Sequence, residues 1–438
     1  MGAKRLLDGF DDEAAARLGK RLRSTMERLN PICRSITGDG VRETLAVLAE
    51  RVPLRIHEVP SGTQVHDWTV NDEWNVRDAY VADARGNRVI DFRAHNLHLV
   101  SYSVPFRATM SLDELRPHLH SLPDHPDWIP YRTSYYHRTW GFCLSHRQLQ
   151  AMKADDGPYE VVVDTTLQPG SLTYGELVMP GDTEDEVLFT THVCHPSIAN
   201  DNLTGMALAV EFAHALGQLR RHYTYRFVFA PGTIGSITWL SQNSAVLPRI
   251  RHGLVLTGLG GPGPLVYKRT RRGDRQIDRA CAHVVTHSGG EVRGYSPYGY
   301  DERQFNALGF DLPVGRLSRT PHGEYPEYHT SADNLDYVRD DELIGSYRAL
   351  VQIQGVVENN RTYRNLRPFG EPQLGKRGLY PTTGGKSASD EVMAMLWTLG
   401  YADGSTSQLD IADRAEMDFA ALRAAGDKLA DAGLLEQV

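Results

Sequence analysis

The chain has 438 residues, of which 41% are hydrophobic and 23% charged, and its formal net charge is −8. This composition is typical of an ordinary soluble globular protein, and the length favours two or three domains over one. The negative charge gives no reason to expect nucleic acid or an anionic membrane as the main partner.

The N-terminal segment and the cysteines both favour a cytoplasmic location. The first 22 residues carry acids and bases at helical spacing and contain no apolar stretch of the secretory type. No apolar run in the chain approaches the length of a membrane span. The cysteines lie far apart and form no CxxC pair, which suits a reducing compartment. They are Cys33, Cys143, Cys194 and Cys281.

After a helical stretch over residues 13–50, a β-rich insertion is predicted for residues 63–158. The segment AYVADARGNRVIDF has a hairpin pattern around a Gly-Asn turn, and NLHLVSYSVPF continues in extended form. A loop-like segment, SLPDHPDWIP, and an aromatic, basic stretch, YRTSYYHRTWGF, complete this region.

Strands and helices then alternate up to about residue 360. Strands are predicted at 159–164, 186–192, 224–230, 253–258 and 311–315, and helices at 203–219, 234–246, 275–288 and 341–358. This alternation argues for an α/β domain, built from residues 1–62 and 159–365 around a mostly parallel sheet. Ligands of such sheets bind where the strands end.

The last seventy residues predict a winged helix-turn-helix over residues 370–438. A Gly- and Pro-rich linker at 367–386 precedes three short helical segments and a terminal extended piece. From Glu371 onward there are eleven Asp or Glu and six Lys or Arg, a net charge of −5. Since DNA binding depends largely on neutralising phosphates, we expect a packing or dimerisation module rather than a nucleic-acid reader.

The strongest chemical signal is THVCHPSIANDNLTG, residues 191–205. His192 ends a predicted strand, and Asp201 lies just before a predicted helix, so the two can converge on one metal ion. The alternative is a surface loop in which Asp201 only caps the helix. Two neighbours are rival ligands: His195, which could be a simple turn residue before Pro196, and Cys194, which is more simply a small buried residue.

Two later segments add acidic and imidazole groups. In TPHGEYPEYHTSADNLDYV, residues 320–338, His329 lies near Glu324 and other carboxylates that could orient a ligating imidazole. In SPYGYDERQFNALGF, residues 296–310, Asp301 and Glu302 could supply an acid and a base to a pocket. A solvated acidic loop and a surface charge run are the respective alternatives.

Together these segments resemble the zinc aminopeptidase superfamily, the metallo-exopeptidases of bacterial leucyl aminopeptidase type. Its metal-binding order is His-x-Asp, Asp-Asn before a helix, a Glu pair, an Asp, and a His followed by Thr. His192, Asp201-Asn202 and His329-Thr330 match the first, second and last of these motifs. The resemblance implies that His192, Asp201 and His329 are the metal ligands.

More closely, the whole chain resembles a bacterial aminopeptidase-like family with an inserted β domain and a C-terminal winged helix. The segments that carry this resemblance include WNVRDAYV, NLHLVSYS, SYYHRTWGFCLSH, GSLTYGE, YDERQF and GEPQLGKRGLY. It implies a zinc-aminopeptidase-like mixed sheet flanked by helices. Members often occur beside polysaccharide or natural-product biosynthesis genes.

The chain departs from the superfamily at three positions. Cys194 stands in place of the Asp of His-x-Asp, Gly232 and Thr233 in place of the Glu pair, and Gly261 where another metal carboxylate is expected. Two zinc ions need more negative charge than one carboxylate supplies, so a single Zn²⁺ with an open position is expected.

The expected activity is zinc-assisted hydrolysis of an amide or peptide bond in a small substrate, with a carboxylate as general base. Glu302 and Glu324 are the leading candidates for that base, followed by Asp301. Tyr135, Tyr136 and Arg132 of the insertion are expected to cover the site, and a homo-oligomer is one further expectation. The alternatives are cyclisation or acyl transfer at the same zinc, as in the superfamily's glutaminyl cyclase branch, or a degenerate binding scaffold.

Overall fold

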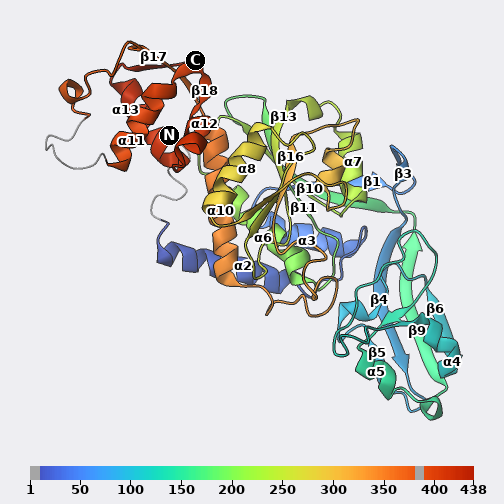
Figure 1. Ribbon diagram of the computed structural model, residues 1–438. Coiled ribbons are helices and arrows are strands. Elements are labelled where there is room, and N and C mark those ends of the chain that lie inside the picture. Colours follow the sequence, from blue (N-terminus) through green and yellow to red (C-terminus); the bar gives the residue numbers. More distant parts are fainter. Residues whose placement is uncertain (1–9, 380–388) are drawn as a thin grey trace.

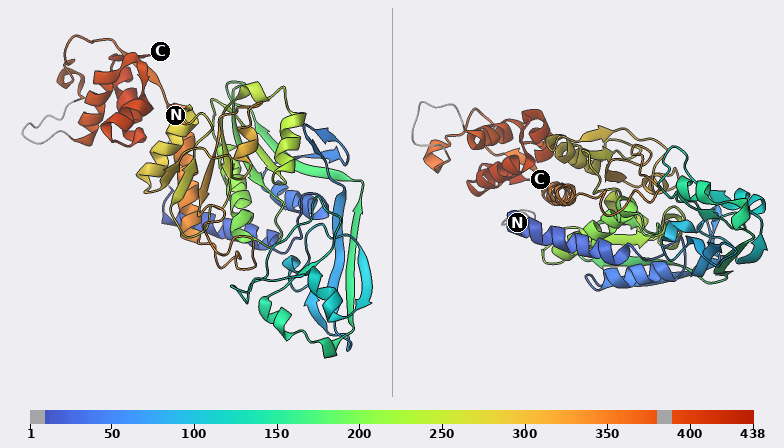
Figure 2. Two further views of the ribbon diagram at one scale, coloured as in Figure 1. Left: turned by 45° about the vertical axis from the view of Figure 1, so that its right-hand side comes forward. Right: turned by 90° about the horizontal axis from the view of Figure 1, so that it is seen from below.

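The computed structural model describes residues 10–379 and 389–438. Figure 1 shows a central α/β body with a β-rich lobe at one end and a small helical module at the other. Both views of Figure 2 keep these two parts on opposite sides of the body. The N-terminal segment that argues against a secretory signal and the predicted linker at 367–386 each lie partly outside the described residues.

The central body contains an eight-stranded mixed sheet in the order β1-β10-β12-β11-β13-β16-β14-β15. Strands β12, β11, β13 and β16 run parallel, whereas β1, β10 and β12 pair antiparallel on one side and β14 pairs antiparallel with β16 on the other. The strands are β1 (Arg55–Pro60), β10 (Ser171–Met179), β11 (Glu186–His192), β12 (Thr224–Ala230), β13 (Ile250–Leu256), β14 (Leu265–Lys268), β15 (Glu291–Arg293) and β16 (Val314–Arg319).

Helices cover both faces of this sheet, which is why its inner strands are apolar throughout. All seven residues of β11 and of β12 are buried, as expected for strands with protein on both sides. Alternate side chains of β12 enter opposite cores, Phe227 on one face and Val228 on the other. One face carries α2 (Asp12–Leu29), α3 (Asp39–Ala49), α6 (Thr204–Leu216), α8 (Gln276–His287) and α10 (Asp340–Asn359); the other carries α7 (Ile234–Gln242) and α9 (Glu302–Phe305).

The β-rich lobe is built on a four-stranded sheet in the order β5-β4-β9-β6. Strands β4 and β5 form the predicted antiparallel hairpin, with Gly86 at a positive φ in its turn. The lobe and its approach comprise β2 (Gln64–Val65), β3 (Trp68–Thr69), β4 (Glu73–Ala82), β5 (Arg88–Asp91), β6 (Phe106–Met110), α4 (Leu112–Leu115), β7 (Leu119–His120), β8 (Phe142–Cys143), α5 (His146–Ala151) and β9 (Tyr159–Gln168).

Two strands lie on the other side of the predicted domain boundaries. Strand β9 was expected in the α/β sheet, but it pairs with β4 and β6 of the lobe. Strand β17 (Thr362–Asn365) pairs with β18 and β19, so it belongs to the winged-helix sheet rather than to the end of the α/β domain. A short apolar run predicts a strand but not its partners, because pairing is decided by distant segments. The helical stretch at 13–50 is likewise two helices, α2 and α3.

The C-terminal module has the predicted three helices and a small sheet in the order β18-β17-β19. It comprises β17, α11 (Asp390–Tyr401), β18 (Asp403–Ser407), α12 (Gln408–Ala415), α13 (Phe419–Asp431) and β19 (Leu435–Gln437). Arg279 and His283 on α8 contact Asp410 and Asp413 on α12, at 2.5 and 2.7 Å. The module is therefore docked on the central body by polar contacts.

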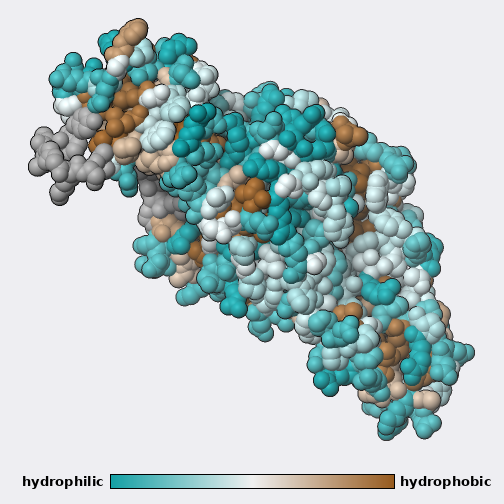
Figure 3. Space-filling model, viewed as in Figure 1, coloured by the Kyte–Doolittle hydropathy of each residue, from teal (hydrophilic) through white to brown (hydrophobic). Residues whose placement is uncertain are grey.

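The visible surface is mixed, with polar residues over most of the central body and apolar residues in separate small groups (Figure 3). None of the helices within residues 10–379 and 389–438 combines the length and the apolar character that a bilayer crossing needs.

Candidate metal centre

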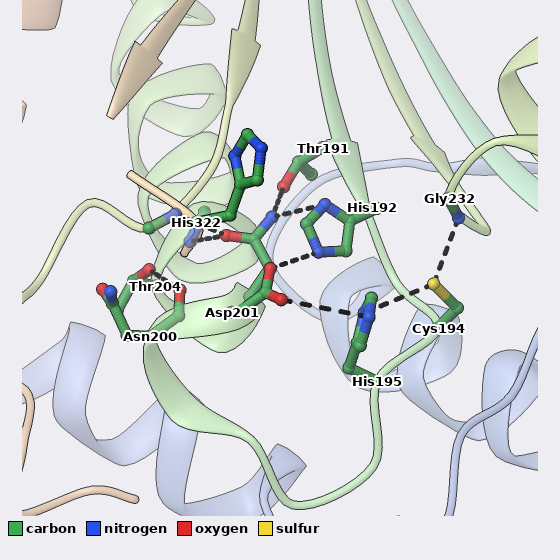
Figure 4. Close-up of polar contacts among 12 residues, drawn as sticks. Thr191, His192, Cys194, His195, Asn200, Asp201, Thr204, Gly232 and His322 are labelled. Carbon is green, nitrogen blue, oxygen red and sulfur yellow. Dashed lines mark hydrogen bonds and ion pairs between the residues drawn. The ribbon is translucent and has the colours of Figure 1, made fainter. Parts of the chain in front are cut away.

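His192, Asp201 and His329 lie together at the carboxyl edge of the parallel strands. Figure 4 shows His192 and His195 directed at Asp201. His192 is the last residue of β11, and Asp201 lies in the tight turn before α6. The Asp201 Oδ1 atom is 2.7 Å from His192 Nε2, and its Oδ2 atom is 3.1 Å from His329 Nε2. Asp201 and His192 are buried, whereas one third of the His329 side chain is exposed. The centre is thus reached from the His329 side.

His195 joins this cluster, although as a residue before Pro196 it was interpreted more simply as part of a turn. Its Nε2 atom is 3.9 Å from Asp201 Oδ2, and its ring centre is 4.9 Å from that of His192 and 5.0 Å from that of His329. The ligand atoms of His192, His195 and Asp201 all lie within 4.8 Å of one another. The spacing His192-x-x-His195 was the available signal in the sequence.

Asp333 fixes the turn that carries Asp201. It accepts hydrogen bonds from the backbone N–H groups of Asn200 (2.6 Å) and Asp201 (3.2 Å) and from the Tyr325 hydroxyl (3.0 Å). Burial raises the pKa of Asp333 to about 7 despite these donors. The acidic loop around His329 therefore supports the neighbouring Asp201 carboxylate, and Asp333 is the residue that does so.

Asn202 ties the same turn to the sheet beside His192. Its amide group donates to Thr191 Oγ1 (2.7 Å) and to the Leu256 carbonyl (3.1 Å), and lies 3.4 Å from His192 Nδ1. The Tyr300 ring stacks on the His192 ring, with centres 5.5 Å apart. Because both sides of the imidazole are occupied, His192 is held facing Asp201.

Cys194 supports His195 rather than entering the cluster itself. Its Sγ atom accepts a hydrogen bond from the Gly232 backbone N–H at 3.1 Å and lies 3.4 Å from His195 Nδ1. Burial raises the pKa of Cys194 to about 12, so the group is a neutral thiol. Because His195 Nδ1 faces the sulfur, Nε2 is the ring nitrogen directed at Asp201.

The electrostatics of the cluster suit a cation. Burial opposes ionisation of Asp201, but the imidazoles of His195 and His192 outweigh it and hold the pKa of the carboxyl well below its usual range. Burial likewise opposes protonation of His192, yet the charges of Asp201 and Asp301 raise its pKa. Burial lowers the pKa of His195 well below its usual range. A buried carboxylate facing three imidazole nitrogens is a donor set that fits zinc.

Asp301 is the candidate base whose charge acts on His192. It is buried, and its Oδ1 atom accepts a hydrogen bond of 2.7 Å from the Thr233 backbone N–H at the start of α7. Burial raises the pKa of Asp301, and the charge of His192 opposes that rise. Thr233 and Gly232 are the residues for which the resemblance predicts no glutamate pair, and Asp301 brings a carboxylate next to them from a distant segment.

Glu302 and Glu324 have other partners. Glu302 is fully buried, and its Oε1 atom is 2.9 Å from Lys268 Nζ and 3.5 Å from Arg316 Nη1. Glu324 is half exposed and forms an ion pair with Arg293, 3.0 Å from Oε2 to Nη2. Both side chains are thus directed to cations rather than to the imidazole cluster.

The inserted lobe reaches the centre through Tyr131. The Tyr131 N–H donates to the His329 carbonyl at 2.8 Å, and its ring centre is 5.3 Å from His195 and 5.2 Å from His329. Of the predicted covering residues, Tyr135 lies behind it with a 2.7 Å contact between hydroxyls, while Tyr136 and Arg132 are exposed. The predicted cover comes from the expected stretch, but Tyr131 is the residue against the imidazoles.

Similarities to known proteins extend over the whole chain. Residues 23–360 match a family described as a domain of unknown function (DUF4910), and residues 361–437 match a winged helix-turn-helix family. A Clostridium acetobutylicum protein, whose name joins polysaccharide biosynthesis to an aminopeptidase-like domain, is 51% identical over 96% of this chain and 97% of its own.

Solved structures show the same fold. The crystal structure of a candidate peptidase from Clostridium acetobutylicum has a TM-score of 0.94 and 47% identity, and the match covers 100% of both chains. The zinc aminopeptidase BSAP from Bacillus subtilis has a TM-score of 0.55 at 15% identity, covering 77% of this chain and 94% of its own. A peptidase M28 precursor from Shewanella amazonensis has a TM-score of 0.53 at 14% identity, covering 79% and 96%. At this distance the last two similarities concern the fold.

Proposed function

This chain belongs to the DUF4910 family, and on that premise we propose that its aminopeptidase-like domain is a zinc-dependent hydrolase of an amide or peptide bond. The observation that carries the proposal is the buried Asp201 carboxylate, which faces the Nε2 atoms of His192, His195 and His329 at 2.7, 3.9 and 3.1 Å. Ligand atoms about 2.0–2.2 Å from one zinc ion lie roughly 3.2–3.6 Å apart in a tetrahedron. The His192 and His329 separations are shorter than this range and the His195 separation is slightly longer, so small side-chain shifts would bring the donors to zinc-binding distances.

One ion per chain is the stoichiometry that the residues support. His192, Asp201 and His329 would hold it, with His195 as a further donor next to them. Gly232 and Gly261 have no side chain to offer at the remaining superfamily positions. A single carboxylate supplies too little charge for two adjacent zinc ions.

Asp301 is the group we assign as general base. When bound, the ion supplies Lewis-acid polarisation of the scissile carbonyl and makes a water molecule more acidic. Asp301 accepts the proton of the attacking water and returns it to the nitrogen of the leaving amine. The raised pKa of Asp301 makes its carboxylate a stronger base toward the attacking water. The protonated carboxyl can still donate that proton to the leaving nitrogen, which is more basic than the carboxylate.

The exposed edge of His329 and the ring of Tyr131 would be the first surfaces that a substrate meets. Tyr131 covers one side of the cluster, which favours a small substrate over a long polypeptide. The name of the Clostridium relative places that protein in polysaccharide biosynthesis, and we propose an amide-bearing precursor of such a pathway as the substrate class.

Zinc content tests the centre directly. We expect about one zinc per chain in the wild type, and the loss of most of it in His192→Ala and His329→Ala. The control His287→Ala removes an imidazole on α8 whose Nδ1 atom faces the His283 carbonyl at 2.8 Å, and it should keep its zinc. A wild-type chain that takes up no zinc from a zinc-buffered solution would contradict the proposal.

Turnover tests the reaction. A panel of aminoacyl p-nitroanilides and short peptides should release free amine from the zinc-loaded wild type and not from His192→Ala. Mass spectrometry of the products separates hydrolysis from cyclisation or acyl transfer, because only hydrolysis adds a water. Zinc retained without turnover of any amide would favour a binding scaffold and count against the enzyme.

A further inference from the structure

His322 lies beside the metal centre in the loop after β16 and is not one of the predicted ligands. Its ring centre is 4.6 Å from Tyr300 and 6.2 Å from Tyr328. Those two tyrosines in turn pack on His192 and His329, with ring centres 5.5 and 3.9 Å apart. The imidazole is partly exposed, and Figure 4 draws it next to the Asp201 turn.

Arg316 decides which nitrogen of His322 carries the proton. Its Nη1 atom is 3.3 Å from His322 Nδ1. A guanidinium group can only donate hydrogen bonds, so Nδ1 must accept and the proton of the neutral ring resides on Nε2. Within residues 10–379 and 389–438, no hydrogen bond joins His322 Nε2 to another residue. The loop therefore presents an N–H donor that has no protein acceptor.

Buried charges hold Arg316 in this position. Glu302 lies 3.5 Å from Arg316 and 2.9 Å from Lys268, and all three side chains are at most 4% exposed. Two cations share one carboxylate, so positive charge remains next to His322. Burial and the Arg316 charge, with a smaller contribution from Lys268, lower the pKa of His322 to about 4, against the opposing effects of Glu302 and Asp201. The imidazole is neutral at physiological pH.

We propose that His322, held as its Nε2–H tautomer by Arg316, donates a hydrogen bond to the scissile carbonyl oxygen and stabilises the negative charge that develops there. This inference rests on the proposed hydrolase function. No proton is transferred in this step, because a neutral imidazole N–H is a weak acid and remains a donor throughout the reaction. Arg316 is then a positioning residue, and Glu302, one of the two leading candidates for the base from the sequence, anchors Arg316.

Nitrogen NMR of the histidine rings tests the tautomer without substrate or metal. In ¹⁵N-histidine-labelled wild type at pH 7, we expect His322 to be neutral and protonated on Nε2. His98 and His287 are internal references, because their Nδ1 atoms face the carbonyls of Cys143 and His283 at 2.7 and 2.8 Å and must carry the proton. A His322 ring that is charged at pH 7, or protonated on Nδ1, would overturn the proposal.

The positioning role of Arg316 has its own spectroscopic signature. Arg316→Met should abolish the tautomer preference of His322 and raise its pKa, whereas Arg316→Lys retains a donor and should preserve the Nε2–H form. If Arg316→Met fails to fold, the lysine variant carries the test. A His322 tautomer unchanged in a folded Arg316→Met protein would contradict the assignment.

Kinetics of the zinc-loaded enzyme test the catalytic role. His322→Phe removes the donor and should lower kcat by about 10²–10³-fold with little change in KM, the usual effect of losing one oxyanion donor. His322→Gln keeps an N–H near the Nε2 position and should remain within about tenfold of the wild type. Both variants should bind zinc as the wild type does. If wild type turns over amides and His322→Phe is equally fast, the inference fails alone; if wild type with zinc turns over none, the proposed function fails and the inference with it.

Discussion

Residue 232 lies next to the imidazole cluster but brings no carboxylate to it. A Cβ atom built on Gly232 would lie 3.3 Å from Cys194 Sγ and 3.7 Å from His192 Cβ, so a side chain there would point into the cluster. The glycine leaves that direction without a carboxylate. The buried Asp301 carboxylate, which comes from another segment, accepts a hydrogen bond from the backbone N–H of the next residue, Thr233. Position 232 therefore has no carboxylate, and the Asp301 carboxylate lies next to it.

Cys194 should tune metal affinity without binding the metal. In Cys194→Ala, the His195 imidazole loses its partner at Nδ1, and we expect zinc affinity to fall by about 10–100-fold, as for other partners of ligating histidines. Cys143→Ala is the matched control, because that thiol is equally buried but lies in the inserted lobe. Competition with a chromogenic chelator measures both. Equal zinc affinity of the two variants would show that Cys194 has no such role.

His252 should make the fold sensitive to acid. This histidine of β13 is 4% exposed, and burial lowers its pKa from 6.5 to about 4. Since the unfolded chain binds the proton more readily, the free energy of unfolding should fall as the pH drops from 6.5 towards 4, by roughly 1.4 kcal/mol per unit. Urea unfolding at pH 7 and pH 5 should show a smaller loss for His252→Gln than for the wild type. The exposed His137→Gln control should keep the full loss, and an identical loss in all three proteins would contradict the assignment.

Among the elements, the three strands β10, β12 and β11 are joined by one buried arginine. Arg226 of β12 bonds to Glu176 of β10 at 2.7 Å and to Glu186 of β11 at 2.7 and 2.9 Å, and Trp239 of α7 donates to Glu176 at 2.9 Å. β11 ends at His192, so this network lies in the sheet that positions the metal centre. Each carboxylate has a cation within reach, which is the condition for burying it at tolerable cost.

Breaking this network should destabilise the sheet strongly. Arg226→Met leaves two carboxylates buried without a cation, and we expect a loss of about 3–5 kcal/mol in the free energy of unfolding. Arg77→Met is the control, since Arg77 is 67% exposed in its pair with Asp164 between β4 and β9, and it should change stability little. Chemical denaturation measures both variants. Similar midpoints for the two would show that the buried pair contributes no more than the exposed one.

In the whole molecule, the two appended parts differ in their relation to the centre. Segment 129–131 of the inserted lobe pairs with the loop of His329, through the bridge of Pro130 with Thr330. The winged-helix module docks on α8, on the opposite side of the body in Figures 1 and 2. The lobe can therefore influence which substrates enter, while the contacts of the module with the body, as far as residues 361–379 and 389–438 are described, include Arg279 and His283 of α8 and not the candidate ligands.

The full chain should bind duplex DNA weakly. The second helix of the helix-turn-helix pair, α13, carries Arg423 and Lys428, and both are engaged, with Asn359 Oδ1 at 2.6 Å and with Glu391 respectively. Together with the net negative charge, this leaves little to neutralise phosphates. Fluorescence anisotropy with a mixed-sequence duplex at 50 mM salt should show no saturation below about 10 µM. A submicromolar complex that weakens steeply with added salt would contradict this prediction.

The α/β class, the hairpin of the lobe and the helices of the C-terminal module were predictable because each depends on local periodicity. The proximity of His192 and Asp201 was predictable for a related reason, whereas His329 was assigned to the same site by resemblance to the superfamily's motif order. In a parallel sheet the strand ends meet at one edge, so a histidine closing a strand and an aspartate opening a helix are brought near each other. Their roles as zinc ligands stay predictions, as do the catalytic roles of Asp301, Glu302 and Glu324.

Partners that are distant along the chain could be read only from the packed structure. Strand β9 has the same apolar run in either sheet, and its neighbours β4 and β6 assign it to the lobe. The triplet Asp301-Glu302-Arg303 shows acids and a base, but not that Asp301 meets Thr233 while Glu302 meets Lys268 and Arg316. The periodicity of a sequence shows which face of a helix or strand is buried. It does not show which distant element covers that face, and burial between elements is what forces particular charges to pair.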